Sequence, residues 1–235
     1  MTTETPAGRI FCAIDTTDLD AALALAETLR GRVGGVKLGK EFFTAHGPQG
    51  VARVAAAGHR IFLDLKYHDI PNTVAGAVRA ASTLGCFMLT VHASGGAAMI
   101  GAGVAARGAA RLPKIAAVTV LTSLSEPDLE AVGQNGPISD QVLRLGRLAR
   151  AAGADALVAS PHEVTMLREA LGPDCLLVVP GVRPEWAGTD DQKRMMTPAD
   201  AVRAGADYLV IGRPITRAAD PAEAARRIAD EIAAA

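Results

Sequence analysis

The sequence predicts an α/β protein, and more specifically a single (β/α)8 TIM barrel that takes in all 235 residues. Eight short runs of mostly β-branched and other apolar residues recur along the chain, and each is followed by an Ala/Leu-rich stretch with helical spacing. Strands that alternate with helices form a parallel sheet with the helices outside it. Eight such units in 235 residues give about 29 residues a unit, which is typical of this barrel.

The expected strands follow one another at regular intervals. They cover residues 9–15, 35–38, 60–66, 86–92, 114–121, 154–159, 175–180 and 207–211. The stretches with helical spacing include residues 19–30, 73–84, 97–110, 140–152, 162–171 and 221–234. Asp18 and Ser125 are expected to cap helix N-termini. Glycine often ends a helix just before the next strand, because it adopts the left-handed C-cap conformation at little cost. These glycines are Gly58, Gly85, Gly153, Gly172 and Gly205.

A doubly wound open sheet is the main alternative fold. Its usual mark is a GxGxxG turn after the first strand. Here that turn reads Asp15-Thr16-Thr17-Asp18 and contains no glycine. No linker or change of composition divides the chain, so we expect one domain over residues 1–235.

Composition excludes several classes of protein. The 24 Lys and Arg residues balance 25 Asp and Glu residues, whereas nucleic-acid and membrane-surface binders carry a basic excess or patch. No run of about 18 apolar residues predicts a membrane span, and residues 1–8 are polar, unlike a secretion signal. Cys12, Cys86 and Cys175 lie far apart in apolar runs, so we expect buried thiols in the cytoplasm rather than a disulfide framework or a metal site.

The densest polar cluster is the segment 64–73, DLKYHDIPNT, directly after an apolar run. Side chains alternate between the two faces of a strand, so Asp64 and Lys66 point one way and the leucines beside them the other. If the leucines pack on the helices, the charges face the barrel interior at its C-terminal end, where barrel enzymes have their active sites. The same alternation turns Asp15 and Lys37 inwards, so we expect four charged side chains at one mouth.

Two interpretations of these four charges are open. Inward charges are costly unless they pair, and a buried ion-pair network could simply fix the barrel. The residue type favours proton transfer instead. The chain has five lysines against nineteen arginines, two of the five face the expected mouth, and lysine can give up a proton where arginine cannot.

A phosphate site is expected at the ends of the last two strands, where barrels often bind phosphate. Gly212 lets an oxyanion approach the backbone, and Arg213 can pair with it. Arg183, after the seventh strand, supplies a second cation. The connection 181–197 is about 17 residues long, against about 2–6 for ordinary loops, so we expect a lid whose Gln192 closes over the phosphate.

Other polar residues near the expected mouth are less diagnostic. Thr122 and Ser123 follow the fifth strand, where they are either ligand contacts or turn formers. The roles of His68 and His92 are open. Trp186 is expected to anchor the long connection.

These motifs resemble the orotidine 5′-phosphate decarboxylase family, in its compact bacterial form. The most specific part is the segment 64–73. The resemblance continues in the same order over nearly the whole chain, at residues 13–15, 36–39, 121–123, 180–184, 191–192 and 211–216. It implies decarboxylation of orotidine 5′-monophosphate to uridine 5′-monophosphate and CO2, the last step of de novo pyrimidine biosynthesis, without a metal or a cofactor.

The resemblance also implies catalytic roles. Lys66 would deliver a proton to C6 of the pyrimidine, within a charged array that includes Lys37, Asp64 and Asp69. Asp69 and Thr73 would reach into the site of a second subunit, so a homodimer is implied. The chemistry agrees, because loss of CO2 leaves an electron pair that the ring delocalises poorly and that the protein must stabilise electrostatically.

The implied substrate contacts lie around this array. Asp15 and Lys37 would hold the ribose hydroxyls, and Thr122 would bind near the pyrimidine. The implied phosphate contacts are Arg183, Gln192, Gly212 and Arg213.

Three alternatives from other classes remain. A magnesium-dependent sugar-phosphate decarboxylase or hexulose-phosphate synthase of the same superfamily places a metal-binding carboxylate on strand two, where this chain has Lys37, a cation that would repel Mg²⁺. A binding barrel would hold nucleotide without turnover. A Schiff-base aldolase needs a lysine that loses its proton easily, whereas carboxylates beside Lys66 would hold that proton in place.

Overall fold

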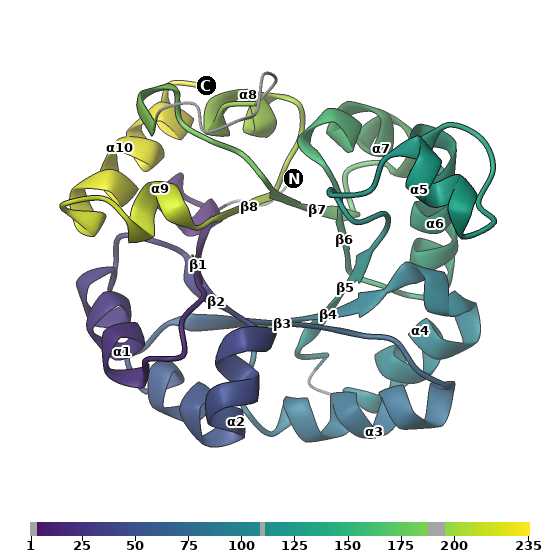
Figure 1. The fold of residues 1–235 in the computed structure, drawn as a ribbon, viewed down its shortest axis with the longest axis horizontal. Helices are drawn as coiled ribbons and strands as arrows, with labels where there is room; N and C mark the ends of the chain where they lie inside the picture. The colour runs from purple at the N-terminus through teal and green to yellow at the C-terminus, as the bar shows by residue number, and fades with distance from the viewer. Residues whose placement is uncertain (1–3, 109–110, 188–195) are drawn as a thin grey trace.

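The strands of the described chain form one closed parallel barrel in the computed structural model, which describes residues 4–108, 111–187 and 196–235 (Figure 1). The strands are β1 (Ile10–Ile14), β2 (Gly35–Gly39), β3 (Arg60–Tyr67), β4 (Met88–His92), β5 (Lys114–Val118), β6 (Ala156–Val158), β7 (Leu176–Pro180) and β8 (Tyr208–Ile211). Each strand pairs in parallel with the next, and β8 pairs with β1 to close the ring. The fold class predicted from the sequence, a (β/α)8 TIM barrel, is confirmed.

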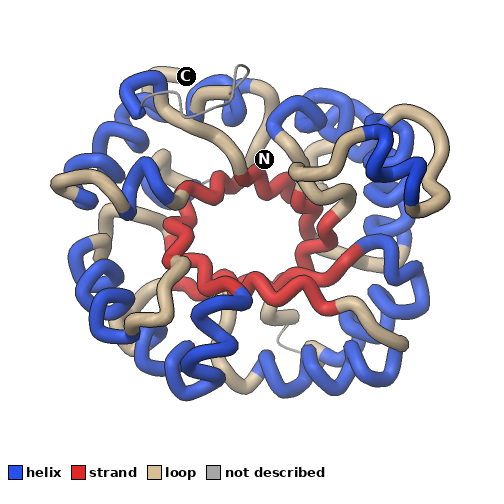
Figure 2. Tube along the Cα trace, in the orientation of Figure 1, coloured by secondary structure: helices blue, strands red, loops and turns tan. Residues whose placement is uncertain are grey.

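Helices surround this ring, as Figure 2 shows with helices in blue and strands in red. They are α1 (Leu19–Thr28), α2 (Lys40–Ala55), α3 (Pro71–Ser82), α4 (Gly96–Ala106), α5 (Glu126–Ala131), α6 (Ile138–Ala151), α7 (Val164–Leu171), α8 (Pro198–Arg203), α9 (Arg213–Thr216) and α10 (Pro221–Ala233). Short 3-10 turns are η1 (Ala7–Arg9), η2 (Ala93–Gly95), η3 (Pro161–Glu163) and η4 (Glu185–Ala187). Within the described ranges, no helix combines the length and apolar character needed to cross a membrane.

The local signals in the sequence act as predicted. Asp18 caps α1, since its carboxylate accepts the backbone N–H of Ala21, and Ser125 forms a capping box with Asp128 at the start of α5. The five expected C-cap glycines all have positive φ, between 65° and 113°. Only glycine adopts this conformation without steric cost, so the helices end where the sequence predicts.

The core has two layers, because the strands alternate between the barrel interior and the helices. On β1, Phe11 and Ala13 belong to the inner apolar cluster, whereas Ile10, Cys12 and Ile14 pack in the outer one. This is the predicted alternation. Because both faces of each strand are buried, the strand sequences are nearly continuous runs of apolar residues.

The N-terminal end of the barrel is closed by aromatic rings around one cation. The Arg60 guanidinium lies 4.7 Å from the ring centre of Phe87 and 5.5 Å from that of Phe11, and it pairs with Glu4 at 2.6 Å. The Tyr208 hydroxyl lies 3.3 Å from the Glu4 carboxylate. These contacts leave the opposite, C-terminal end as the open end of the barrel.

Two aspartates, the buried Asp207 and the partly buried Asp155, connect neighbouring strands to the helix layer, also at the N-terminal end. The Asp207 carboxylate, before β8, accepts the N–H of Leu177 at 2.9 Å and pairs with Arg168 of α7 at 2.6 Å. Asp155, before β6, pairs in the same way with Arg107, the residue that follows α4. These pairs stabilise the end of the barrel that lies away from the predicted site.

Candidate active site

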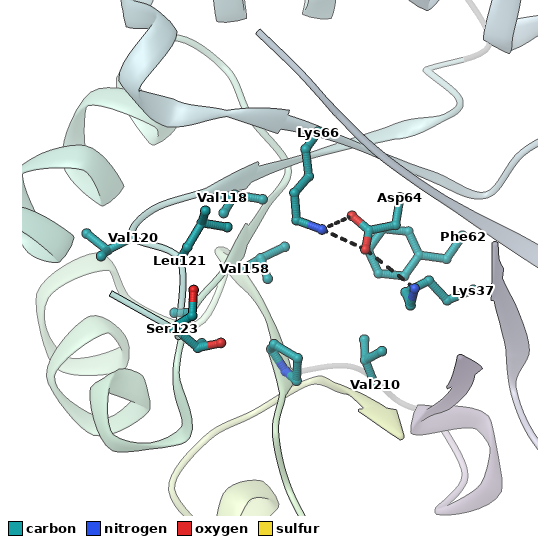
Figure 3. Close-up of a pocket in the computed structure, with 13 residues that line it drawn as sticks. Lys37, Phe62, Asp64, Lys66, Val118, Val120, Leu121, Ser123, Val158 and Val210 are labelled. Atoms are coloured by element: carbon teal, nitrogen blue, oxygen red, sulfur yellow. Dashed lines mark hydrogen bonds and ion pairs between the residues drawn. The ribbon is translucent and has the colours of Figure 1, made fainter. Parts of the chain in front are cut away.

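A cavity of about 270 Å³ opens among the C-terminal ends of the strands (Figure 3). Charged side chains form one wall, apolar side chains from β5 to β8 form much of the rest, and two hydroxyl residues follow β5. The lining residues are Lys37, Phe62, Asp64, Lys66, Val118, Val120, Leu121, Thr122, Ser123, Val158, Ala159, Pro180 and Val210. A largely apolar hollow with a few convergent charges suits a small polar ligand with a flat apolar body.

The charged wall is a chain of alternating carboxylates and ammonium groups. The Nζ atom of Lys37 lies 3.2 Å from Oδ1 of Asp15 and 3.6 Å from Oδ2 of Asp64. The Nζ atom of Lys66 lies 2.8 Å from each carboxylate oxygen of Asp64. Figure 3 shows Asp64 between the two lysines. The structure thus brings together the four residues that strand alternation turned inwards.

Burial increases towards the middle of this array. The side chains of Lys37 and Asp64 are 10% and 13% exposed, Lys66 is 24% exposed, and Asp15 is 54% exposed. Burial acts to raise the pKa of Asp64, but the ammonium groups of Lys37 and Lys66 and two hydrogen bonds outweigh it, so that the pKa lies below the ordinary value of 3.8. Asp64 is therefore ionised at neutral pH.

The backbone of β3 departs from a regular strand at Lys66. Leu63 pairs with Leu89 and Tyr67 with Val91, so four steps along β3 match two steps along β4. Within this bulge, Lys66 has a φ of 51°, in the left-handed region that costs an L-residue about 1–2 kcal/mol. Strained backbone of this kind gathers at functional sites.

Thr90 is a site residue that sequence reasoning missed. Its buried hydroxyl accepts the backbone N–H of Lys66 at 2.8 Å and donates to Oδ1 of Asp64 at 2.9 Å. One signal was present in the sequence. Thr90 is a polar residue inside a strand, at a position that alternation turns inwards together with Met88.

Asp69 and Thr73 lie outside the cavity of their own chain. Both are exposed, and a carboxylate oxygen of Asp69 accepts the N–H of Ile70 at 2.6 Å. Ile70 is itself 66% exposed, which is unusual for a large aliphatic residue. The array of one chain therefore contains Lys37, Asp64 and Lys66 but not Asp69.

The expected phosphate residues lie on the β8 and β7 side of the barrel. Gly212 and Arg213 line a second hollow of about 550 Å³, together with Asp15, which also contacts Lys37 of the array. A Cβ atom added to Gly212 would lie 3.5 Å from its nearest neighbour, so packing alone does not require glycine there. Arg183 follows β7, and its backbone N–H donates to the carbonyl of Met196.

The structure describes the two ends of the expected lid, residues 181–187 and 196–197. Gln192 and the rest of residues 188–195 lie outside the described residues. Trp186, just before them, stacks under the guanidinium of Arg227 of α10 at 4.2 Å. This contact fixes one end of the long connection to the helix layer.

His68 and His92, whose roles the sequence left open, lie next to each other beside the array. The ring centres of His68 and His92 lie 5.5 Å apart. Burial, and then electrostatic interaction with the neighbouring side chains of His68, Lys40 and Lys66, lower the pKa of His92 below 6.5. His92 is thus neutral at pH 7.

Comparison with known proteins agrees with this geometry. Residues 8–228 match the model of a family described as the orotidine 5′-phosphate decarboxylase / HUMPS family. The chain belongs to this family. A relative named orotidine 5′-phosphate decarboxylase, from Paramagnetospirillum magneticum, is 55% identical over 95% of this chain and 97% of its own length. Another of that name, from Geobacter sulfurreducens, is 50% identical over the full length of both chains.

A solved member of the orotidine 5′-phosphate decarboxylase family has the same fold. The crystal structure of orotidine 5′-phosphate decarboxylase from Lactobacillus acidophilus superposes with a TM-score of 0.82 at 38% identity, over 95% of this chain and 98% of that one. The family predicted from the sequence is confirmed.

Proposed function

We propose that the protein is a carboxy-lyase that converts orotidine 5′-monophosphate to uridine 5′-monophosphate and CO2, the last step of de novo pyrimidine biosynthesis. Full-length relatives at 48–55% identity carry the name of this activity. The observation that carries the proposal is the position of Lys66, whose ammonium group is held by both oxygens of Asp64 at the wall of the cavity. A fixed ammonium group is both a positive charge and a proton source.

In the proposed reaction, the bond between C6 of the pyrimidine and its carboxylate breaks. CO2 leaves, and the bonding electron pair stays on C6, where the ring delocalises it poorly. Lys66 stabilises this charge and then transfers a proton from Nζ to C6, and solvent returns the proton to the lysine. Because Asp64 is ionised at neutral pH, its two oxygens attract and orient the Lys66 ammonium group before the reaction. Such preorganised charge is the largest contribution in many enzymes.

The substrate contacts follow from the two hollows. Asp15 and Lys37, at their junction, suit the ribose hydroxyls, and Thr122 suits the polar edge of the pyrimidine. The phosphate is assigned to Arg183, Gln192, Gly212 and Arg213. The glycine at 212, which packing does not require, supports close approach of a phosphate oxygen to the backbone.

We also propose a homodimer in which Asp69 and Thr73 complete the array of the partner. Two observations support it. Asp69 lies outside the cavity of its own chain, and the exposed Ile70 beside it supplies apolar area for an interface. Isologous contact would then place the segment of each subunit at the site of the other.

The proposed enzyme uses neither metal nor cofactor. Lys37 lies between Asp15 and Asp64, so an ammonium group already neutralises the carboxylates that a magnesium ion would need. The magnesium-dependent relatives are therefore not favoured. The buried thiols of Cys12, Cys86 and Cys175 fit a cytoplasmic protein. Pairing of β1 with β8 supports one domain over residues 1–235.

The direct test is to mix the purified protein with orotidine 5′-monophosphate in EDTA and follow the ultraviolet absorbance. Rapid turnover supports the proposal. Nucleotide binding without turnover would point to a binding barrel, and turnover of sugar phosphates only with added Mg²⁺ would point to the metal-dependent relatives.

A further inference from the structure

Thr90 lies directly behind the charged array, at the point where β3 and β4 lose their regular pairing. Its side chain is buried, and the residue is only 1% exposed. It does not line the cavity, so it does not meet a ligand there. We propose that Thr90 is a positioning residue for the decarboxylation proposed above, on which this inference rests: its hydroxyl holds the backbone of Lys66 and the carboxylate of Asp64 in one fixed arrangement.

The two hydrogen bonds of Thr90 have a fixed direction. The N–H of Lys66 can only donate, so Oγ1 of Thr90 accepts it, at 2.8 Å. The single hydroxyl proton is then free for Oδ1 of Asp64, which is an acceptor when ionised, at 2.9 Å. One hydroxyl therefore joins the backbone of the proposed proton donor to the side chain that orients its ammonium group.

Lys66 needs such support because its backbone conformation is energetically unfavourable. Its φ of 51° lies within the bulge between the pairs Leu63–Leu89 and Tyr67–Val91. The Thr90 hydroxyl accepts the Lys66 N–H as a carbonyl of a neighbouring strand would. A strained backbone conformation persists only where the surrounding structure holds it in place. The hydrogen bond from the Lys66 N–H to Thr90 is one contact that holds this conformation.

The same hydroxyl acts on the carboxylate of Asp64. Oδ1 of Asp64 accepts from Lys66 Nζ as well as from Thr90, while Oδ2 faces both Lys66 and Lys37. The hydrogen bond from Thr90 limits rotation of the Asp64 carboxylate, so both of its oxygens stay in contact with Nζ of Lys66. This bond is also among the contacts that lower the pKa of Asp64, after the effects of the two lysines.

Two substitutions separate positioning from packing. Thr90→Val keeps the shape of the side chain and removes the hydroxyl, while Thr90→Ser keeps the hydroxyl. The matched control is Thr119→Val, just after β5. Thr119 is also buried, at 4% exposure, and its hydroxyl donates to the backbone carbonyl of Val158 rather than to a residue of the charged array.

The inference predicts a change in kcat rather than in binding. Thr90→Val lowers kcat for orotidine 5′-monophosphate by about 10- to 100-fold, while KM and the Kd of uridine 5′-monophosphate change by less than about threefold. Thr90→Ser stays within about threefold of wild type, and so does Thr119→Val. If Thr90→Val and Thr119→Val alter kcat equally, or if Thr90→Ser is as slow as Thr90→Val, the inference is overturned.

A second measurement does not depend on turnover. NMR of the Asp64 carboxyl carbon reports its titration in each folded variant. The Asp64 pKa rises in Thr90→Val and stays at the wild-type value in Thr90→Ser and Thr119→Val, and an unchanged pKa in Thr90→Val would refute the positioning role. If the wild-type protein shows no turnover, the proposed function fails, and this titration still decides the role of Thr90.

Discussion

The Nζ atom of Lys66 lies 2.8 Å from both carboxylate oxygens of Asp64, although the two residues stand only two positions apart on β3. On a regular strand, the Cα atoms of two such residues are about 6.6 Å apart, and their side chains point in the same direction. The bulge in β3 and the left-handed backbone of Lys66 accompany this closer approach. The proposed proton donor and the carboxylate that orients it thus both lie at the C-terminal end of β3, two residues apart.

Removal of Lys37 should raise the pKa of Asp64. Lys37 exerts the largest of the effects that oppose burial, and Asp64→Asn serves to assign the signal. In the wild type, Asp64 stays ionised between about pH 5 and pH 8. In Lys37→Met, we expect its carboxyl carbon to titrate at a higher pH by NMR. An unchanged titration would show that the two side chains do not interact as the structure indicates.

The lowered pKa of Asp64 also makes stability depend on pH. Because the folded-state pKa lies below the unfolded value, the unfolded chain binds more protons. The stabilisation is fully present above about pH 5 and is lost as the pH falls through the unfolded and then the folded-state pKa. The difference in free energy of unfolding between wild type and Asp64→Asn, measured by urea at several pH values, should therefore shrink only below about pH 5. A difference that already shrinks from pH 7 would contradict the sign of the shift.

Arg213 should contribute to binding through the phosphate. We expect Arg213→Ala to lower kcat/KM by about 100-fold or more, or about 2.7 kcal/mol. Arg226→Ala is the control, because Arg226 pairs with Glu223 and Asp230 on the surface of α10, and its loss should change kcat/KM by less than about threefold. An effect of Arg213→Ala below about threefold would remove this residue from the phosphate site.

Mixed subunits test the contribution of Asp69 in trans. Lys66→Ala and Asp69→Asn are each expected to be inactive. If Asp69 completes the site of the partner, a mixed dimer has one intact site, and random reassociation of equal amounts recovers about a quarter of wild-type activity. Activity after unfolding and refolding the mixture is the measurement. No recovery, with mixed dimers demonstrated by mass, would place Asp69 elsewhere.

The N-terminal end of the barrel should govern stability without affecting catalysis. Asp207 is 1% exposed and bonded to Arg168 and to a strand N–H, so Asp207→Ala should lower the free energy of unfolding by about 3–5 kcal/mol. Asp200→Ala, which breaks an exposed pair with Arg203, should cost about 1 kcal/mol or less. Urea unfolding measures both, and the folded variants should keep the wild-type kcat. Equal losses of stability would contradict the assigned burial.

The fold could be predicted because several local signals agree. Apolar runs, helical spacing and glycines at helix ends all indicate the same strand–helix units, and the period of two on β1 separates Phe11 and Ala13 from Cys12 and Ile14 as the structure does. The inward positions of Asp15, Lys37 and Asp64 followed from the same period, and Lys66 lies on the same wall although a bulge interrupts the strand there. Regular periodicity is enough to place side chains on one face of a strand.

The finer geometry of the site was beyond this reasoning. The bulge at Lys66 breaks the period of two that was used to place it, and no glycine or proline marks it in the sequence. Thr90 was missed because its partners are set by the pairing of β3 with β4, which local patterns do not specify. In the proposed homodimer, the role of Asp69 depends on the partner subunit, and one chain's structure places its exposed carboxylate outside the cavity.

The central claim is that Lys66 donates the proton in a decarboxylation that needs no cofactor. Its most direct test is the ultraviolet absorbance change of orotidine 5′-monophosphate in EDTA, with wild type and Lys66→Ala side by side. We expect rapid turnover by the wild type, and a rate lower by about 10⁴-fold or more for Lys66→Ala, which still binds uridine 5′-monophosphate. Turnover by Lys66→Ala within about tenfold of wild type would contradict the account.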